Sequence, residues 1–156
     1  MNLIKLKIYI DTSIVGGYFD EEFSKATKEL FGRLENREVT FVLSDVLLKE
    51  LNSAPANVKK LLGEYPQECF EYVSLTQESI DLANRYIAEK VVSKTSLDDC
   101  RHIAIATINK VDVIASWNFK HIVNLEKIKG YNSVNLKYGY SMLEIRNPKE
   151  LLKYEK

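Results

Sequence analysis

The sequence predicts an α/β fold in which a central, mostly parallel sheet is flanked by helices in a three-layer arrangement. A short apolar run, residues 7–10, lies so near the N-terminus that no earlier strand can pair with it. Further short apolar runs then alternate with segments that show the apolar spacing of helices. Parallel strands need a crossover between them, usually a helix, so this alternation places the first strand inside a parallel sheet.

Length and composition predict one globular domain over residues 1–156. The chain is 46% hydrophobic and 28% charged, which is enough apolar material for a sizeable core. Lys5 and Lys7 interrupt the apolar N-terminal segment, and no run of about 18 apolar residues occurs, so we expect a cytoplasmic protein without a membrane segment. Cys69 and Cys100 form no C-x-x-C pair, and we expect two buried thiols.

The charge distribution is uneven although the formal net charge is zero. Zero net charge disfavours a protein that coats nucleic acid through bulk electrostatics alone. Residues 1–118 carry 14 Lys and Arg against 18 Asp and Glu, a net of −4, whereas residues 119–156 carry 8 against 4, a net of +4. An acidic body with a basic end fits a metal site beside a phosphate-contacting rim, and chance also produces an asymmetry of this size.

The elements expected in the first half of the chain follow from apolar spacing and turn residues. In order, they are the strand 7–10, a loosened backbone at Gly16 and Gly17, a helix over 21–34, a strand over 39–43, a helix capped by Ser44, a short helix around 58–63, a strand over 71–75 and a helix over 77–91. Helices and strands alternate throughout, as an α/β fold requires.

The second half continues the same alternation. A helix over residues 96–108 feeds directly into an apolar strand over 111–116, and a further strand is expected over 133–136. The run Asn147-Pro148-Lys149-Glu150 supplies an N-cap, a proline at the first helical position and a glutamate at the third, so it predicts a closing helix.

Four polar residues stand at element ends in this scheme. Asp11 follows the first strand, where the chemistry of open α/β sheets collects. Glu50 lies near the end of the helix after Ser44, Asp99 at the start of the helix 96–108, and Asn118 just after the strand 111–116. For Asp11, a helix N-cap or an Asx turn is the structural alternative, because Thr and Ser follow it directly.

The acidic pair at the start of the helix 96–108 also has two interpretations. Ser96-x-x-Asp99 has the form of a capping box, which would give Asp99 a purely structural role. A carboxylate at a helix start is favoured by the helix dipole, and this holds for Asp98 as well as for Asp99. The choice between Asp98 and Asp99 as a site residue therefore stays open at this point.

Together the four residues have the composition of a site for a hard cation. Asp11, Glu50 and Asp99 offer carboxylate oxygens and Asn118 an amide oxygen, so Mg²⁺ or Mn²⁺ are the natural ligands. Such an ion lowers the pKa of a bound water and neutralises charge that develops on a phosphodiester. The pattern therefore predicts metal-assisted hydrolysis.

The order of these motifs resembles a PIN-domain protein. The resemblance rests on residues 8–13 (IYIDTS), on Glu50, on residues 99–106 (DCRHIAIA) and on residues 116–119 (SWNF), and it spans essentially the whole chain. It implies a parallel α/β sheet with flanking helices and a metal-dependent endoribonuclease, as in the VapC-like toxins of type II toxin-antitoxin pairs. It also implies an RNA substrate, an antitoxin partner and a homodimer.

By matching position, the resemblance implies that Asp11, Glu50 and Asp99 are metal ligands and that Asn118 is the fourth site residue. Asn118 departs from the family, which commonly has Asp there, so the site has one negative charge fewer and would hold a second cation less well. The alternative is a degenerate PIN-like module that binds RNA or protein without catalysis. Haloacid-dehalogenase-like phosphatases are disfavoured, because they need a second Asp where Ser13 stands.

The histidines and aromatic residues near these motifs have structural alternatives as well. His102 lies three residues after Asp99, and we expect it to pack in the helix or to pair with that carboxylate. His121 is expected on the solvated surface, with a role at a phosphate as the alternative. Trp117 and Phe119 either pack around the strand end or stack on a nucleobase.

Overall fold

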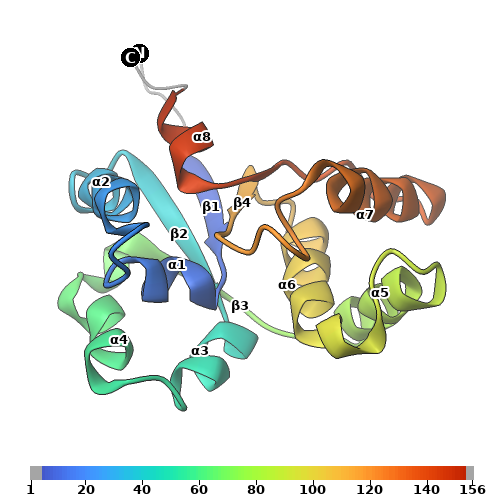
Figure 1. Cartoon of the computed structure of the whole chain (residues 1–156), viewed down its shortest axis with the longest axis horizontal. Coiled ribbons are helices and arrows are strands. Elements are labelled where there is room, and N and C mark those ends of the chain that lie inside the picture. The colour runs from blue at the N-terminus through green and yellow to red at the C-terminus, as the bar shows by residue number, and fades with distance from the viewer. Residues whose placement is uncertain (1–4, 154–156) are drawn as a thin grey trace.

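A computed structural model describes residues 5–153 and forms a sheet of five parallel strands (Figure 1). The strand order is β3-β2-β1-β4-β5, and every neighbouring pair is parallel. The strands are β1 (Leu6–Ile10), β2 (Val39–Ser44), β3 (Phe70–Val73), β4 (Val113–Ala115) and β5 (Ile145–Arg146). The α/β class is confirmed, and β1 is the central strand of the sheet, as predicted.

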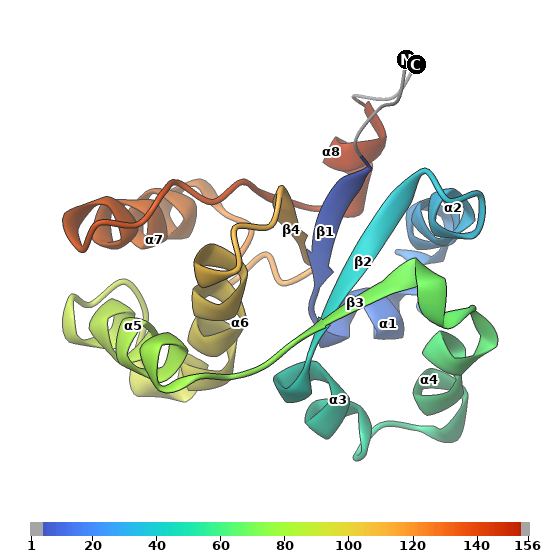
Figure 2. The ribbon, with the colours of Figure 1, turned by 180° about the vertical axis from the view of Figure 1, so that it is seen from behind.

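Helices cover both faces of the sheet, which gives the three layers seen in Figures 1 and 2. One face carries α1 (Thr12–Gly17), α2 (Ser24–Glu35), α4 (Ala56–Leu61) and α8 (Pro148–Lys153), and the other carries α5 (Gln77–Ala88), α6 (Leu97–Ile108) and α7 (Leu125–Lys137). Helix α3 (Asp45–Leu51) directly follows β2, at the carboxyl edge of the sheet. Short 3₁₀ turns, at Leu62–Glu64, Gln67–Cys69 and Lys94–Ser96, complete the connections.

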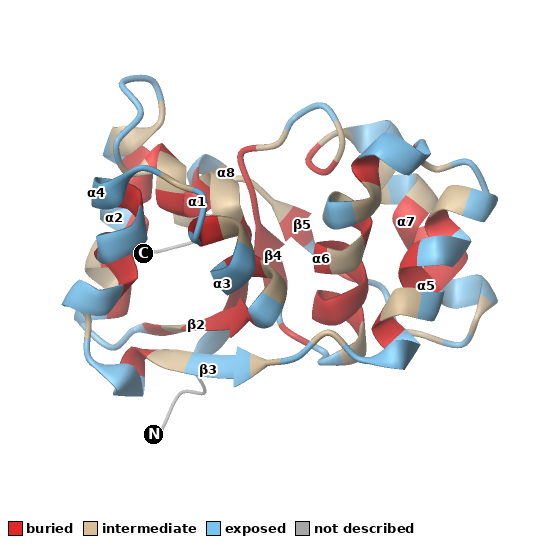
Figure 3. Cartoon of the chain, turned by 90° about the horizontal axis from the view of Figure 1, so that it is seen from below, coloured by how far each residue is buried: buried red, intermediate tan, exposed pale blue. Residues whose placement is uncertain are grey.

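The central strand contributes to two separate cores. Ile8 and Ile10 pack into the core under α1 and α2, whereas Tyr9 packs into the core under α5 and α6. All three side chains are buried, because side chains alternate between the faces of a strand and both faces are covered here. Figure 3 shows buried residues on the sides of the helices that face the sheet.

The local start signals read from the sequence are confirmed. The Ser44 hydroxyl accepts a hydrogen bond from the Leu47 amide at 3.1 Å and so caps α3. Asn147 and Glu150 form the expected capping box at α8, with each side chain accepting from the other residue's amide, at 3.1 and 3.0 Å. Cys69 and Cys100 are buried free thiols, as expected.

Two local predictions were wrong. Residues 133–136 are not a strand but lie inside α7, and the last strand is Ile145–Arg146 instead. Gly16 and Gly17 do not loosen the backbone, because both belong to α1. Gly17 is needed for packing, since a Cβ there would lie 2.7 Å from the Trp117 ring.

Among residues 5–153, no helix is long and apolar enough to span a bilayer.

Candidate active site

Asp11 directly follows β1, at the carboxyl edge of the sheet, and helix α3 contacts both α1 and α6. The Asp11 side chain is only 4% exposed. The Ser13 hydroxyl donates to Oδ1 at 2.6 Å, and the Ser116 hydroxyl donates to Oδ2 at 2.5 Å. Asp11 is the N-cap residue of α1, but its side chain forms no cap hydrogen bond. The carboxylate is thus held by two hydroxyls and not used to start the helix.

The end of β4 supports Asp11 through its backbone. The Trp117 amide donates to the Ser13 hydroxyl at 2.8 Å, and the Asn118 amide donates to the Ser116 hydroxyl at 2.9 Å. Each serine oxygen is therefore fixed by an N–H group while it donates its proton to Asp11. The Asn118 side chain serves a different purpose, since its Oδ1 accepts from the His121 amide at 2.9 Å and closes a turn.

Glu50 comes from the last turn of α3 and contacts α1 and α6. Its Oε1 accepts hydrogen bonds from the Thr12 hydroxyl and, at 2.8 Å, from His102 Nε2. The Glu50 side chain is 28% exposed, so one side of the carboxylate stays open to solvent. A residue adjacent to Asp11 and a residue of α6 thus orient Glu50.

His102 connects Glu50 to the buried core. Its side chain is 3% exposed, and its Nδ1 lies 2.6 Å from the Tyr9 hydroxyl. That hydroxyl lies 2.7 Å from the Ser44 hydroxyl, which caps α3. The prediction that His102 packs in the helix is confirmed, but its carboxylate partner is Glu50 and not Asp99.

Asp99 is half-buried and shares an electrostatic environment with the other two acids. Burial raises the pKa of Asp99, and the negative charges of Asp11 and Glu50 raise it further. Asp98, in contrast, is exposed and lines a pocket between α3 and α6. The capping box expected from Ser96 is not formed, because Ser96 makes no side-chain cap hydrogen bond. Of the two neighbouring acids, Asp99 is the half-buried one, and the charge of Asp11 acts on it.

Burial and His102 set the protonation of the remaining groups. Burial raises the pKa of Asp11, and the charge of His102 and the hydroxyls of Ser116 and Ser13 oppose it only in part. Burial also raises the pKa of Glu50, but the hydrogen bond and charge of His102 outweigh it, so that the pKa is lowered overall. Burial alone would lower the pKa of His102. The hydrogen bond to Glu50 and the charges of the nearby carboxylates outweigh burial, so the pKa of His102 is raised overall.

The donor chemistry of this cluster fits a hard divalent cation. Asp11, Glu50 and Asp99 offer oxygen ligands. Burial and, after it, the charges of Asp11 and Glu50 raise the pKa of Asp99, and a bound cation would offset both effects. In their present conformations, no three Asp, Glu, His or Cys side chains among residues 5–153 are close enough to hold an ion. Glu50 and Asp11 are instead turned to hydroxyl and imidazole partners.

Aromatic residues form one wall beside this cluster. Trp117 is buried, stacks on Phe23 at a ring-centre distance of 4.2 Å, and donates from Nε1 to the Thr27 hydroxyl. Trp117 therefore packs and is not available to a nucleobase. Phe119 is 46% exposed and packs edge to face with the Trp117 ring, so part of its side chain is open to solvent.

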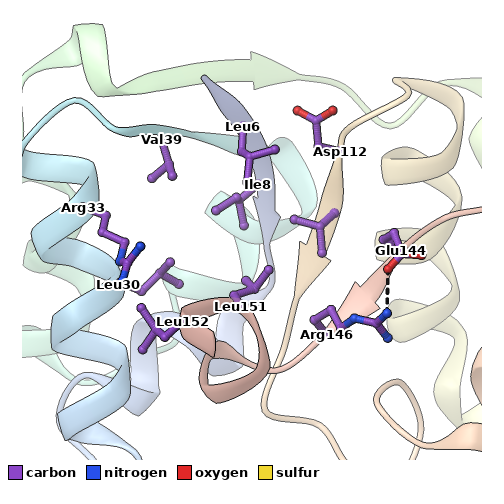
Figure 4. A pocket seen from close by; sticks show the side chains of 11 residues that line it. Leu6, Ile8, Leu30, Arg33, Val39, Asp112, Glu144, Arg146, Leu151 and Leu152 are labelled. Atoms are coloured by element: carbon purple, nitrogen blue, oxygen red, sulfur yellow. Dashed lines mark ion pairs between the residues drawn. The ribbon is translucent and has the colours of Figure 1, made fainter. Parts of the chain in front are cut away.

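The opposite edge of the sheet carries an apolar pocket of about 420 Å³ (Figure 4). Leu6 and Val39 stand at the amino ends of their strands, and Leu151 and Leu152 of α8 close the pocket from the side. An ion pair of 2.9 Å between Arg146 and Glu144 lies at its rim. Because Asp11 stands at the carboxyl end of β1, this pocket is remote from the acidic cluster.

Sequence reasoning missed the hydroxyl and imidazole groups that hold the acids. Ser13 and Ser116 belong to the motifs at the strand ends, but nothing in the sequence pairs Ser116 with the carboxylate of Asp11, 105 residues earlier. The link between His102 and Glu50 likewise spans 52 residues. The only sequence signal for it was the spacing that puts His102 and Asp99 on one face of a helix.

The fold is similar to those of toxins and of toxin-antitoxin complexes, whereas no protein-family model and no curated protein matches the sequence. One similar structure is VapBC2 from Rickettsia felis bound to a DNA fragment from its promoter. A chain of that complex matches with a TM-score of 0.58 and 12% identity, over 91% of this chain and 98% of that chain. The sarcin-ricin loop cleaving toxin VapC20 of Mycobacterium tuberculosis matches with a TM-score of 0.56 and 12% identity, over 72% and 91%.

A toxin-antitoxin complex from Klebsiella pneumoniae gives a TM-score of 0.56 at 16% identity, over 77% of this chain and 93% of that chain. At such identities the likeness shows the fold alone. That fold is the one expected from the sequence, the parallel α/β arrangement of VapC-type PIN-domain toxins.

Proposed function

We propose that this protein is a Mg²⁺- or Mn²⁺-dependent endoribonuclease of the cytoplasm that acts as the toxin of a type II toxin-antitoxin pair. The observation that carries the proposal is that Asp11 and Glu50, near the carboxyl edge of a PIN-like sheet, act electrostatically on Asp99 of α6. Three separate elements supply these acids, and the charges of Asp11 and Glu50 act on Asp99. Grouped carboxylates that perturb one another's pKa are typical of functional sites.

Hydrolysis of an RNA phosphodiester needs an activated water and neutralisation of the negative charge on the phosphate. A bound Mg²⁺ or Mn²⁺ would supply both, and Asp11, Glu50 and Asp99 are the residues that would hold it. Ser13 and Ser116 fix the direction of the Asp11 carboxylate.

Glu50 would be the second metal ligand in this proposal, and neighbouring side chains hold it in place. His102 and Thr12 bind the same oxygen of Glu50, which leaves the other carboxylate oxygen without a protein partner among the described residues. The charge of His102 also keeps Glu50 ionised, as a metal ligand must be.

Asn118 takes the place of a fourth acid in this proposal. Its backbone amide binds Ser116, which in turn holds Asp11, so Asn118 acts on the site through Ser116. With three carboxylates the site has the charge for one divalent cation, and a second would be held weakly.

The partners follow from the resemblance and from the solved relatives. A relative from Klebsiella pneumoniae is a toxin-antitoxin complex, which supports an antitoxin partner for this chain. We also propose a homodimer, which light scattering tests directly, since a monomer at all concentrations would contradict it.

The first experiment is RNA cleavage by the purified protein. A set of structured and single-stranded RNAs is incubated with Mn²⁺, with EDTA, and with the Asp11→Asn variant in Mn²⁺. We expect cleavage by the wild-type protein that disappears in both controls. A folded wild-type protein that neither cuts these RNAs nor binds Mn²⁺ in calorimetry would contradict the proposal.

A second candidate function is a degenerate PIN-like module that binds RNA or protein without catalysis. Two observations favour it: Asn118 stands where the family commonly has Asp, and no three metal-binding side chains of residues 5–153 are arranged around an ion. In that case Asp11→Asn changes binding or stability but removes no hydrolysis. Metal-dependent cleavage that the variant loses would exclude this module.

A further inference from the structure

A polar pocket of about 490 Å³ adjoins the candidate active site between α3 and α6. It is lined by Asp45, Val46, Lys49, Glu50, Leu75, Asp98 and Arg101. Because Glu50 belongs both to this pocket and to the acidic cluster, the pocket is continuous with the place where a substrate would react.

Arg101 is unusual among the polar groups of the protein. Its Nε is buried and has no hydrogen-bond partner, and it is the one such side-chain atom among residues 5–153. Asp98 lies three residues earlier on α6, at a spacing that allows an ion pair on a helix, yet no such pair forms in the described chain. Buried donors are nearly always paired in folded proteins, and neither Asp98 nor any other described acceptor binds Arg101 Nε, so this donor can bind an outside ligand.

Lys49 supplies a second free cation in the same pocket. No hydrogen bond or ion pair of Lys49 is formed within the part of the chain that the structure describes. Two acids of the pocket are already engaged, since Asp45 accepts from the Leu75 amide at 2.9 Å and Glu50 accepts from His102. The third acid, Asp98, is exposed and forms no hydrogen bond or ion pair in the described chain. Arg101 and Lys49 are thus two cations of the pocket that none of its carboxylates binds.

We propose that Arg101, with Lys49 on the facing helix α3, binds a phosphate of the RNA strand next to the bond that is cleaved. This inference rests on the proposed nuclease function and adds a phosphate site to it. A guanidinium offers parallel N–H groups that match two phosphate oxygens, and a lysine adds a point charge.

The position of the pocket explains why the site needs these cations. Asp11, Glu50 and Asp99 repel the phosphates of an RNA strand, and a cation held by them offsets this only at the reacting phosphate. A strand that crosses Glu50 continues into the pocket, where Arg101 and Lys49 compensate the next phosphate. This favours RNA as the ligand of the pocket. An RNA substrate must cross Glu50 to react at the acidic cluster, whereas an acidic protein segment does not react there and would be repelled by Glu50.

The test measures RNA binding in the absence of cleavage. The full chain with Asp11→Asn is mixed with a fluorescent single-stranded RNA in EDTA, and anisotropy gives the affinity over a series of KCl concentrations. Arg101→Gln and Lys49→Gln are compared with Lys60→Gln, which changes an exposed lysine of α4 outside the pocket.

We expect each pocket variant to weaken binding and to lower the slope of log K against log [KCl] by about 0.7, the change for one lost phosphate contact on a single strand. Lys60→Gln should leave both quantities unchanged. Arg101→Lys keeps the charge and should retain the slope while binding more weakly than the parent, which separates a phosphate contact from a folding defect. Equal slopes and affinities for Arg101→Gln, Lys49→Gln and Lys60→Gln would overturn the proposal.

The phosphate site and the nuclease function fail in different ways. If the wild type cuts RNA but the pocket variants bind like Lys60→Gln, the phosphate site alone is wrong. If the wild type cuts nothing while RNA binding depends on Arg101, the phosphate site is supported and the nuclease function is wrong. Binding of polyglutamate that depends on Arg101, without such dependence for RNA, would overturn the proposal in favour of an acidic protein partner.

Discussion

His102 Nε2 lies 2.8 Å from Glu50 Oε1, and this contact links a candidate metal ligand to the buried side of the sheet. The other nitrogen of the ring lies 2.6 Å from the hydroxyl of Tyr9, in the central strand. Asp11 directly follows the same strand, two residues after Tyr9. The two carboxylates at Asp11 and Glu50 are therefore positioned by one strand and its partners.

Removal of the His102 imidazole should destabilise the protein. His102→Leu leaves the Tyr9 hydroxyl and a partly buried Glu50 without their partner, and breaking a buried pair costs about 3–5 kcal/mol. Since Glu50 is 28% exposed, we expect a smaller loss of about 2 kcal/mol in the free energy of unfolding. Urea denaturation measures it, with His102→Gln as the matched variant that keeps a donor. Equal stability of His102→Leu and the wild type would contradict the pairing.

The same pair gives stability a defined dependence on pH. The pKa of His102 is raised in the folded state, so its contribution is full below the usual value of 6.5 and is lost as the pH rises through the folded value. The pKa of Glu50 is lowered, so its contribution is full above the usual value of 4.5 and is lost as the pH falls through the folded value. Both contributions are complete between these values.

We therefore expect the stability difference between the wild type and His102→Gln to be largest near pH 5–6 and to shrink toward alkaline pH. Urea denaturation from pH 5 to 9 measures this difference. A difference that is constant over the whole range would show that the imidazole acts through packing alone.

Asp11→Asn should stabilise the fold while it removes the proposed activity. Burial raises the pKa of Asp11, so the folded state binds its proton more tightly and ionisation at neutral pH costs stability. The amide carries no charge, and the serine hydroxyls can rotate to meet it. We expect the Tm at pH 7.5 to rise by about 2–4 °C, the shift for 1 kcal/mol in a protein of this size.

The gain in Tm from Asp11→Asn should shrink as the pH falls and Asp11 becomes protonated in the wild type. Thermal unfolding at pH 7.5 and pH 5 measures both effects. A variant less stable than the wild type at pH 7.5 would contradict the expectation that the ionised Asp11 carboxylate lowers the stability of the fold.

Two adjacent glycines of α1 provide a matched test of the packing beside Asp11. A Cβ on Gly17 would lie 2.7 Å from the Trp117 ring and 3.1 Å from the Thr27 hydroxyl, whereas nothing lies within 4 Å of a Cβ on Gly16. Gly17→Ala should cost about 1–3 kcal/mol through overpacking. Gly16→Ala should add about 0.5–1 kcal/mol, because Ala favours a helix. Similar unfolding free energies for the two variants would contradict this packing.

The sequence predicted the sheet well, because the signals for β1 and its neighbours are local. Short buried runs and caps such as Ser44 depend only on nearby residues. The strand expected over 133–136 failed for a physical reason. Helix α7 turns Asn132 and Asn135 into the core, where they bind the Leu143 backbone and the Thr107 hydroxyl, so its buried face carries no plain apolar pattern.

The candidate site was predictable as a set of positions but not as a set of contacts. Asp11 follows a strand and Asp99 starts a helix, and a parallel sheet brings both kinds of element end to its carboxyl edge. Glu50 stays near that edge because α3 is only seven residues long. The hydroxyl of Ser116 and the imidazole of His102 bind carboxylates that are distant in the chain, so only the packed structure reveals them. Asp98 and Asp99 could be separated only by which of them α6 turns toward Asp11.

The most direct test of a metal-dependent site at Asp11 compares RNA cleavage in Mn²⁺ by Asp99→Asn and by Asp98→Asn. The two variants make the same change at adjacent residues, of which Asp99 is half-buried and affected by the charge of Asp11, whereas Asp98 is exposed. We expect Asp99→Asn to lose more than about 100-fold in rate, beyond the range typical of residues outside the metal's own ligands. Asp98→Asn should cut RNA at least as fast as the wild type. Equal loss in both variants, or undiminished cleavage by Asp99→Asn, would contradict the site described for this protein.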